Sequence, residues 1–294
     1  MKKVLLTGGS GFIGRNLLES ELAGSYDIVA PTRLELDLQD EDAVRAYIRR
    51  VQPDAIIHAA AKPAHRNAKD PTGAFFTNTR NFFNIARNQD YFGKLIITGS
   101  GAVYDLRNYQ PKMSEDYFDT HVPLDEHGMC KYTIEQYIKS AKNIYDLRIF
   151  GIYGKYEDLY IRFISNMICK ALFNLPLSMK QDRYFDYIWV GDLVPVLAYV
   201  IENGLPWHSM NVTPDKSINL LAIAQMVLQM TGKKLPITVE HEGLGLEYSG
   251  SNKRLRSVLP NIIQTPLRDG IKQLVAWYTT IKDSVDYKQL IVNK

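Results

Sequence analysis

The sequence has few cysteines, no long apolar run and little net charge, and each of these absences excludes a class of protein. Cys130 and Cys169 are the only cysteines in 294 residues, which excludes a disulfide framework and favours a reducing, cytoplasmic compartment. No apolar run reaches the roughly 18–20 residues that a membrane span needs, so we expect no membrane partner. The net charge of +3 is too small to indicate a nucleic-acid partner.

Two further signals are missing. The apolar run near the start is cut short by Thr7 and the glycines that follow, so we expect no signal peptide. No spacing of His, Cys, Asp and Glu is typical of a metal site, so we expect no metal. Hydrophobic residues make up 46% of the chain and charged residues 23%, which is ordinary for a globular protein. The length predicts one large unit or two closely packed ones.

The stretch from Lys3 to Gly14, KVLLTGGSGFIG, carries the strongest functional signal. An apolar run typical of a buried parallel strand leads into Gly8, Gly11 and Gly14, after which a helical pattern begins. Glycines at this spacing let the backbone approach a pyrophosphate, whose charge faces the N–H groups at the helix start. An ordinary strand-to-helix turn is the alternative. We assign to dinucleotide binding Gly8, Ser10, Gly11, Phe12, Ile13 and Gly14.

The end of the second predicted strand bears on the choice of cofactor. Strand Asp27–Ala30 is followed by Thr32 and Arg33, where an acidic residue would favour an unphosphorylated ribose. The planar guanidinium of Arg33 can donate two hydrogen bonds to a 2′-phosphate, which favours NADP over NAD. A solvated surface charge is the alternative for Arg33. Asp37 and Leu38, which follow shortly, are also assigned to the cofactor site.

Strands and helices continue to alternate, which predicts an α/β fold with a doubly wound parallel sheet. A third strand ends in small residues, Ala59, Ala60 and Ala61, against which a flat cofactor can lie. Lys62 starts a basic loop that could line a substrate pocket, although a solvated loop is the alternative. A fourth strand runs into Ser100. Because ligands of such sheets bind beyond the carboxyl ends of the strands, we expect these residues to meet there.

Several motifs together resemble a known family. TGGSGFIG is followed by HAAA, by Asn78 before a helix, by GSGAVY and by a lysine on the next helix. Later, LRIFGIYG is similar to LRxFNxYG, and FDYIWVGD is similar to RDYIHVxD. Over nearly its whole length the sequence resembles the extended short-chain dehydrogenase/reductases, and within them the nucleotide-sugar epimerase, dehydratase and reductase group. The resemblance implies a Rossmann-type fold, an NAD(P) cofactor bound in part by Asn78, and a nucleotide-sugar substrate.

The resemblance also implies a catalytic serine and a Tyr-x-x-x-Lys pair, and the pair is altered here. Ser100 matches the serine and Lys131 matches the lysine, which would also bind the nicotinamide ribose, but the tyrosine position is His127. His127 either replaces the tyrosine as acid/base, or binds substrate while another group moves the proton, or marks the loss of hydride chemistry. A free imidazole titrates at about 6.5, and a nearby lysine charge favours its neutral form. The Tyr-x-x-x-Lys spacing at Tyr278 and Lys282 lies far from the serine and is taken as chance.

Other departures from the family pattern narrow the reaction. The resemblance implies an Asp-Glu pair after the serine in dehydratases and a cysteine in 3,5-epimerase-reductases, where this chain has Gly101 and Ala102. Both reactions are therefore disfavoured. Phe185 stands where an arginine usually meets the diphosphate, and Arg183, two residues earlier, either takes that role or is a surface charge. We assign substrate contacts to Lys62, Tyr104 and Arg183.

The pattern as a whole predicts an NAD(P)-dependent nucleotide-sugar enzyme that transfers hydride at a ring carbon, as a 4-keto reductase or a 4-epimerase. A non-catalytic member that binds the dinucleotide as a sensor or partner subunit is the alternative. The resemblance implies a homodimer formed through two helices, expected at residues 75–89 and 130–141. Residues 282–294 are expected to form a polar tail. Two parts are expected, an NAD(P)-binding domain of residues 1–154 and about 183–203, and a substrate-binding part of residues 155–182 and about 204–294.

Overall fold

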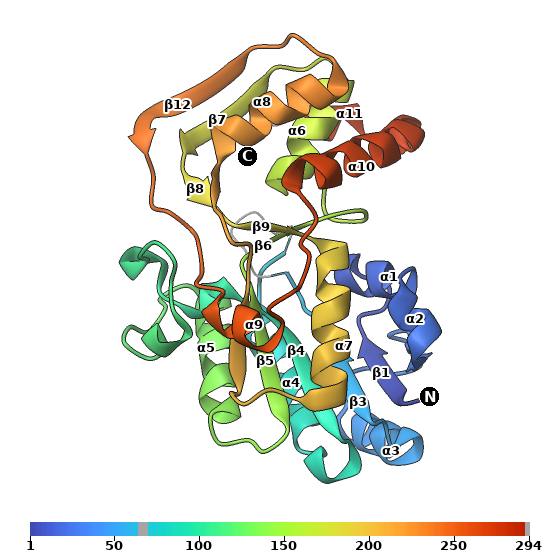
Figure 1. Cartoon of the computed structure of the whole chain (residues 1–294). Coiled ribbons are helices and arrows are strands. Elements are labelled where there is room, and N and C mark those ends of the chain that lie inside the picture. The colour runs from blue at the N-terminus through green and yellow to red at the C-terminus, as the bar shows by residue number, and fades with distance from the viewer. Residues whose placement is uncertain (64–69, 292–294) are drawn as a thin grey trace.

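Six strands lie side by side in one parallel sheet, which confirms the predicted α/β, doubly wound class (Figure 1). The structure is a computed structural model of the chain, of which residues 1–63 and 70–291 are described. The strand order is β10-β5-β4-β3-β1-β2, so the direction of winding reverses between β1 and β3. The strands are β1 (Lys3–Thr7), β2 (Asp27–Val29), β3 (Ala55–His58), β4 (Lys94–Ser100), β5 (Ile144–Ile149) and β10 (Ser209–Val212).

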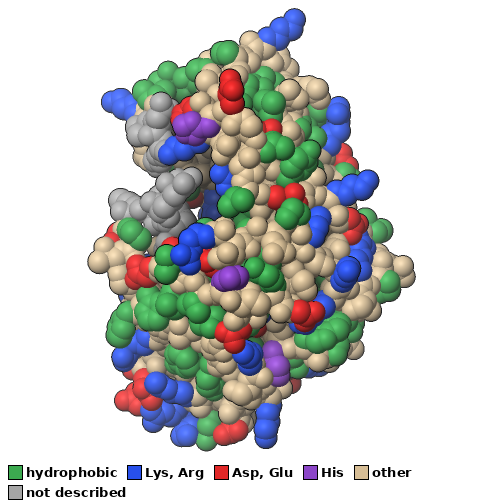
Figure 2. Space-filling view, turned by 90° about the vertical axis from the view of Figure 1, so that its left-hand side faces the viewer, with side chains coloured by type: hydrophobic (Ala, Val, Ile, Leu, Met, Phe, Trp, Pro, Cys, Tyr) green, Lys and Arg blue, Asp and Glu red, His purple; other side chains and the backbone are tan. Residues whose placement is uncertain are grey.

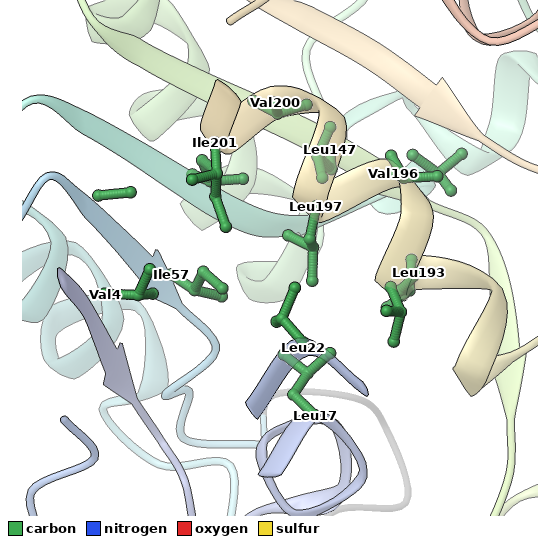
Figure 3. Close-up of a cluster of buried hydrophobic side chains, with 14 of the residues drawn as sticks. Val4, Leu17, Leu22, Ile57, Leu147, Leu193, Val196, Leu197, Val200 and Ile201 are labelled. Carbon is green, nitrogen blue, oxygen red and sulfur yellow. The ribbon is translucent and has the colours of Figure 1, made fainter. Parts of the chain in front are cut away.

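Helices cover both faces of this sheet, because alternate strand residues point to opposite sides. Val4 and Leu6 join one buried cluster (Figure 3), whereas Leu5 between them joins another. The first cluster is completed by α1 (Phe12–Leu18), α2 (Glu21–Ser25), α7 (Leu193–Asn203) and α9 (Lys253–Val258). The second is completed by α3 (Glu41–Val51), α4 (Ala74–Ala86) and α5 (Glu126–Ile138). Burial on both faces explains the apolar runs of β1 and β4.

A smaller part of the molecule packs around paired strands and has a hydrophobic core of its own. Its strand pairs are β6 (Gly151–Tyr153) with β9 (Tyr187–Trp189), β7 (Leu177–Asp182) with β12 (Ile237–Leu244), and β8 (Tyr184–Phe185) with β11 (Ile218–Asn219). Its helices are α6 (Phe163–Leu172), α8 (Leu220–Thr231), α10 (Leu267–Thr280) and α11 (Tyr287–Leu290). Short 3₁₀ helices lie at η1 (Gln89–Tyr91), η2 (Gly101–Val103), η3 (Leu106–Asn108), η4 (Glu115–Tyr117), η5 (Val190–Asp192) and η6 (Lys282–Ser284). Across the described ranges, no helix is long and apolar enough to cross a membrane.

The structure corrects one expected boundary of the substrate-binding part. Ser209 of β10 lies opposite Asp146 of β5, so β10 is the edge strand of the main sheet. Leu255 of α9 is buried in the same cluster as β1. The segment after about residue 204 therefore does not belong wholly to the smaller part, because strand pairing with β5 returns it to the sheet. The remaining domain boundaries stay a prediction.

Two further expectations change at the ends of helices. The helix expected at residues 130–141 begins earlier, at Glu126, because the Asp125 carboxylate accepts a hydrogen bond from the Gly128 N–H and caps it. The expected polar tail contains α11, and Val285 and Leu290 are buried against the core of the smaller part. Residues 292–294 lie outside the described residues.

Candidate active site

The glycine turn after β1 closes directly against the end of β3. Gly8 has a φ of +78°, and a Cβ on it would lie 2.6 Å from the backbone nitrogen of Ala60. A Cβ on Gly14 would lie 2.2 Å from the Gly8 carbonyl oxygen, which also accepts a hydrogen bond from the Gly11 N–H at 3.0 Å. The turn lies where the winding of the sheet reverses, and its shape fits a dinucleotide pyrophosphate.

Asn78 of α4 positions the chain that leaves β3. Its Oδ1 accepts a hydrogen bond from the Lys62 N–H at 2.7 Å, and its Nδ2 donates to the Lys62 carbonyl oxygen at 2.9 Å. The structure thus joins Asn78 to the run that follows Ala61, which is the side of the sheet predicted for the cofactor. The Lys62 ammonium pairs with Asp70 at 2.9 Å and donates to the Thr72 carbonyl oxygen at 2.7 Å, so it holds its own loop. Most of that loop, residues 64–69, lies outside the described residues.

The turn after β2 contains a carboxylate that the sequence reading overlooked. Glu35 accepts hydrogen bonds from the Thr32 N–H at 2.7 Å and from the Thr32 hydroxyl at 2.9 Å, and these bonds lower the pKa of Glu35. Arg33, between them, is exposed. Asp37 is exposed and accepts from the Gln39 N–H, whereas Leu38 is buried against the core. The cofactor contacts assigned to Arg33, Asp37 and Leu38 stay predictions.

The start of α5 packs on the turn that follows β4. Ser100 ends β4, and its hydroxyl oxygen accepts a hydrogen bond from the Ala102 N–H at 3.1 Å. A Cβ on Gly128 would lie 2.9 Å from the Ala102 carbonyl oxygen, so a glycine is needed for this close approach. His127 and Lys131, one helical turn apart, are both half-buried. The start of α5, which contains His127 and Lys131, therefore packs on the turn that follows Ser100.

Lys131 also lies near the end of β3. His58 there is buried, and its Nδ1 lies 2.8 Å from the Thr7 hydroxyl of β1. Burial first, and then the charge of Lys131, lower the pKa of His58 to about 3. His58 is therefore neutral at physiological pH and serves as a structural link between β1 and β3. The effect of the Lys131 charge on His58 places Lys131 near the end of β3, which is compatible with the ribose-binding role predicted for it.

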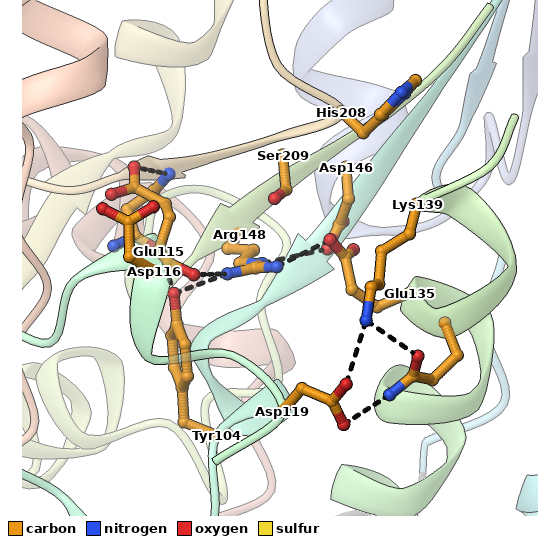
Figure 4. Close-up of polar contacts among 12 residues, drawn as sticks. Tyr104, Glu115, Asp116, Asp119, Glu135, Lys139, Asp146, Arg148, His208 and Ser209 are labelled. Atoms are coloured by element: carbon orange, nitrogen blue, oxygen red, sulfur yellow. Dashed lines mark hydrogen bonds and ion pairs between the residues drawn. The ribbon is translucent and has the colours of Figure 1, made fainter. Parts of the chain in front are cut away.

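Tyr104, which we expect from the sequence to contact substrate, points into the interior instead (Figure 4). It is 2% exposed, and its hydroxyl accepts a hydrogen bond from Arg148 at 2.6 Å and donates to Asn211 at 3.0 Å. Burial raises its pKa well above the usual value. The prediction was wrong because the spacing from Ser100 does not reveal partners that lie 44 and 107 residues away in the chain.

An aromatic group borders the Ser100 turn, and the sequence reading missed it. The ring of Tyr248 stacks on Tyr109 with centroids 5.0 Å apart, and it contacts Phe150 at 5.0 Å and Phe185 at 4.7 Å. The Tyr248 hydroxyl lies 2.9 Å from the position of a Cβ on Gly101, the residue that follows Ser100. These rings come from four separate segments with no common motif, so only the fold brings them together.

Arg183 lies in the smaller part, between β7 and β8. It is half-buried, and a Cβ on Gly245 would lie 3.3 Å from its guanidinium nitrogens. Figure 2 shows the surface hollowed between the two parts of the molecule, with Lys and Arg side chains in and beside the hollow. A positively charged hollow suits a diphosphate, although the contact assigned to Arg183 stays a prediction.

Comparison with known proteins agrees with this geometry. A stretch of 86 residues is 41% identical to GDP-L-fucose synthase of Azorhizobium caulinodans and covers 29% of this chain and 28% of that protein. The fold is similar to UDP-glucose 4-epimerase of Thermotoga maritima, with a TM-score of 0.81, 19% identity and coverage of 95% and 99% of the two chains. It is equally similar to a GDP-mannoheptose C4 reductase of Campylobacter jejuni solved with NADP bound, with a TM-score of 0.81, 20% identity and coverage of 95% and 98%. Residues 4–213 match the NAD dependent epimerase/dehydratase family, and the chain belongs to this family.

Proposed function

We propose that the protein is a cytoplasmic, NADP-dependent enzyme that acts on a nucleotide-activated sugar by hydride transfer at a ring carbon, as a 4-keto reductase or a 4-epimerase. The observation that supports the proposal is the packing of the start of α5, which contains His127 and Lys131, on the turn that follows Ser100. The relatives support it, because a 4-epimerase and a C4 reductase both act at carbon 4.

The residues that would hold the cofactor fit a dinucleotide. The turn from Gly8 to Gly14 would hold the pyrophosphate with its backbone N–H groups, and Asn78 fixes the chain beyond Ala61 along which the dinucleotide would lie. Arg33 would meet the 2′-phosphate, with NAD as the alternative cofactor. Bound NADP supplies and accepts the hydride. Loss of preference for NADPH over NADH in Arg33→Ala would support the role of Arg33.

Three side chains would act on the sugar. Ser100 would hydrogen-bond the oxygen at the reacting carbon, and Lys131 would hold the ribose by a charge-assisted bond. His127, at the position of the family tyrosine, would either move the proton itself or bind the sugar while another group moves it. In both possibilities the reaction is at carbon 4, as the names of the two relatives state for them, and only the group that carries the proton differs.

The first test is a spectroscopic one. The purified protein is mixed with NADPH, or with NADH in parallel, and with a small panel of nucleotide 4-keto-sugars. We expect the reduced-nicotinamide absorbance to fall with at least one sugar. A flat trace with cofactor bound rules out reduction of those sugars and leaves redox-neutral epimerisation, which is followed by chromatography of a UDP- or GDP-hexose after incubation.

A second candidate function is a non-catalytic dinucleotide sensor or partner subunit, which the histidine at the tyrosine position favours. It predicts tight cofactor binding without turnover, and an unchanged biological role in His127→Ala. His127→Tyr separates the cases further. Restored activity would indicate a damaged family site, whereas lower activity would indicate that histidine is adapted to its role.

We also propose that the protein is a homodimer built on α4 and α5. The Phe75 N–H at the start of α4 donates to the Glu126 carboxylate at the start of α5 at 3.1 Å, so the two helices begin side by side. Phe76 and Met129, the next large residues on these helices, are 61% and 36% exposed. Such apolar exposure on paired helices supports a buried interface.

A further inference from the structure

The segment between β12 and α9 leads the chain from the smaller part back to the main sheet and contains Tyr248 (Figure 1). The Tyr248 N–H donates to the Tyr184 carbonyl oxygen at 2.9 Å, and the Asp186 N–H donates to the Tyr248 carbonyl oxygen at 3.0 Å. Two residues later, the Gly250 N–H donates to the Asp186 carboxylate at 2.9 Å. The backbone around Tyr248 is therefore fixed on both sides by β8 and the residue that follows it.

Three aromatic rings hold the Tyr248 side chain in place. Its ring stacks on Tyr109 at 5.0 Å and contacts Phe150 at 5.0 Å and Phe185 at 4.7 Å. Contacts of this kind favour particular ring geometries and restrict rotation of the side chain. The direction of the phenol is thus set by the surrounding structure.

The Tyr248 hydroxyl is directed at the Ser100 turn. A Cβ on Gly101 would lie 2.9 Å from this hydroxyl, so the glycine at 101 leaves the room that the phenol needs. Ser100 and Tyr109 both lie close enough to the phenol to lower its pKa. A tyrosine from the C-terminal half of the chain therefore reaches the serine at which the reacting sugar oxygen would bind.

We infer that Tyr248 is a catalytic residue that donates the proton to the sugar oxygen, taking the role that the family resemblance gives to the tyrosine of Tyr-x-x-x-Lys. His127, which occupies that tyrosine's position, binds the sugar beside Ser100. The inference rests on the proposed function and selects one of its two roles for His127. A phenol is kept in the site, but it comes from a different element of the fold.

In the direction of reduction, the step adds one hydride and one proton to the sugar carbonyl. A hydride from the bound reduced nicotinamide forms the new C–H bond at the carbonyl carbon, and the π pair of the C=O bond moves to the oxygen. The O–H bond of Tyr248 breaks, and its proton goes to that oxygen. The sugar is reduced, the nicotinamide is oxidised, and the Tyr248 phenolate regains a proton from water.

The surroundings of Tyr248 keep the phenol protonated before this step. Burial raises the pKa of Tyr248 to about 12, and the charge of Asp186 adds to the rise. Asp186 is itself paired with Lys112 at 3.3 Å. Three nearby groups act in the opposite direction and lower the pKa of Tyr248, namely Ser100, Tyr109 and Arg162. Such a phenol stays protonated at neutral pH and can still protonate the more basic alkoxide, which suits reduction better than oxidation.

Tyr248→Phe removes the hydroxyl and keeps the ring among its neighbours. Tyr187→Phe is the matched control, because Tyr187 belongs to the same run of rings and stacks on Phe185 at 4.8 Å. The first readout is single-turnover oxidation of NADPH from about pH 6 to about pH 9 with the 4-keto-sugar nucleotide that the wild type reduces. The second is binding of the product nucleotide sugar by calorimetry with NADP present, and circular dichroism checks folding.

We expect Tyr248→Phe to slow hydride transfer about 100-fold or more, with product binding within about threefold of wild type, because a general acid contributes about 10²–10⁴ in rate. We expect Tyr187→Phe to react at close to the wild-type rate, and the wild-type rate to stay level across the pH range. Three outcomes overturn the inference while the proposed function stands. The first is an unchanged rate in Tyr248→Phe, and the second is an equal loss of rate and of product binding in that variant. The third is a wild-type rate that declines above about pH 7, where the decline disappears in His127→Ala. If the wild type reduces none of the sugars, the reductase form of the proposed function fails and the inference fails with it.

Discussion

Gly8 and Gly14 are constrained for different reasons, although both belong to the turn after β1. Gly8 has a φ of +78°, which side chains rarely allow, and it lies against Ala60. Gly14 lies inside α1 and faces the carbonyl oxygen of Gly8, so it lacks room for a Cβ but needs no special backbone conformation. A substitution at Gly14 therefore tests the packing of the turn without a conformational penalty.

We predict that Gly14→Ala weakens NADPH binding by about tenfold or more and lowers the free energy of unfolding by roughly 1–3 kcal/mol. The new Cβ would lie 2.2 Å and 2.7 Å from backbone atoms of Gly8 and Gly9, which must move. Fluorescence titration and urea unfolding measure the two effects. Gly24→Ala is the control, because no atom lies within 4 Å of its new Cβ. Unchanged NADPH affinity in Gly14→Ala would remove the turn from the cofactor site.

At the scale of elements, segments with a strong local signal are predictable from the sequence. The apolar runs at Val4–Leu6 and Ile56–Ile57 become β1 and β3, and the glycine turn lies where the alternation of strands and helices requires it. The glycine turn could be assigned from its neighbouring strand and helix, which a sequence displays directly. Ser100 and Lys131 are assigned through the resemblance of their motifs to those of the family.

Elements placed by distant partners are not predictable in this way. β10, SMNV, has no local sign of its place in the main sheet, which comes from pairing with β5. Tyr248 is brought to Ser100 by backbone bonds to Tyr184 and Asp186, more than 60 residues earlier. Tyr104 has the motif spacing of a site residue, yet its hydroxyl is occupied by Arg148. Sequence patterns do not encode these pairings, because they depend on the whole chain being folded.

A buried ion pair connects α5 to β5. Arg148 of β5 is 1% exposed and pairs with Glu135 of α5 at 2.6 Å, and Asp146 lies 3.7 Å from the same guanidinium. Burial, and then the charge of Glu135, raise the pKa of Asp146 well above its usual range. One arginine therefore lies beside two buried carboxyl groups, Glu135 and Asp146. This ion pair fixes α5, which contains His127 and Lys131, against the sheet.

We predict that Arg148→Met lowers the free energy of unfolding by about 3–5 kcal/mol, because it leaves Glu135 buried without its counter-charge. Urea unfolding measures the loss. Lys139→Met on the same helix is the control, since Lys139 forms a solvent-exposed pair with Asp119 at 2.9 Å, and it should cost less than about 1 kcal/mol. Equal losses in the two variants would show that burial does not set the strength of the Arg148 pair.

For the whole molecule, two of the helices that cover the second face of the sheet, α4 and α5, each expose a large apolar side chain near their start. Phe76 of α4 and Met129 of α5 are 61% and 36% exposed, and the loop before α5 adds Val122 at 44% and Leu124 at 75%. The bond between Phe75 and Glu126 places the starts of the two helices together. Large side chains exposed together near one helix pair are unusual for a surface that stays in water, so we expect a second copy of the chain to cover them.

The last prediction follows from this surface. We expect the protein at tens of micromolar to elute with twice the 33.6 kDa mass of the chain in size-exclusion chromatography with light scattering, and Phe76→Glu with Met129→Glu to elute as a monomer. Two carboxylates on facing copies would be desolvated and would repel each other across the twofold axis. Ile263→Glu is the control, because Ile263 is 87% exposed in the loop after α9, away from both helices in sequence. A monomeric wild type would exclude the homodimer. A double variant that stays dimeric, as the control does, would place the interface on another surface. In either case the apolar surface of α4 and α5 would need another partner.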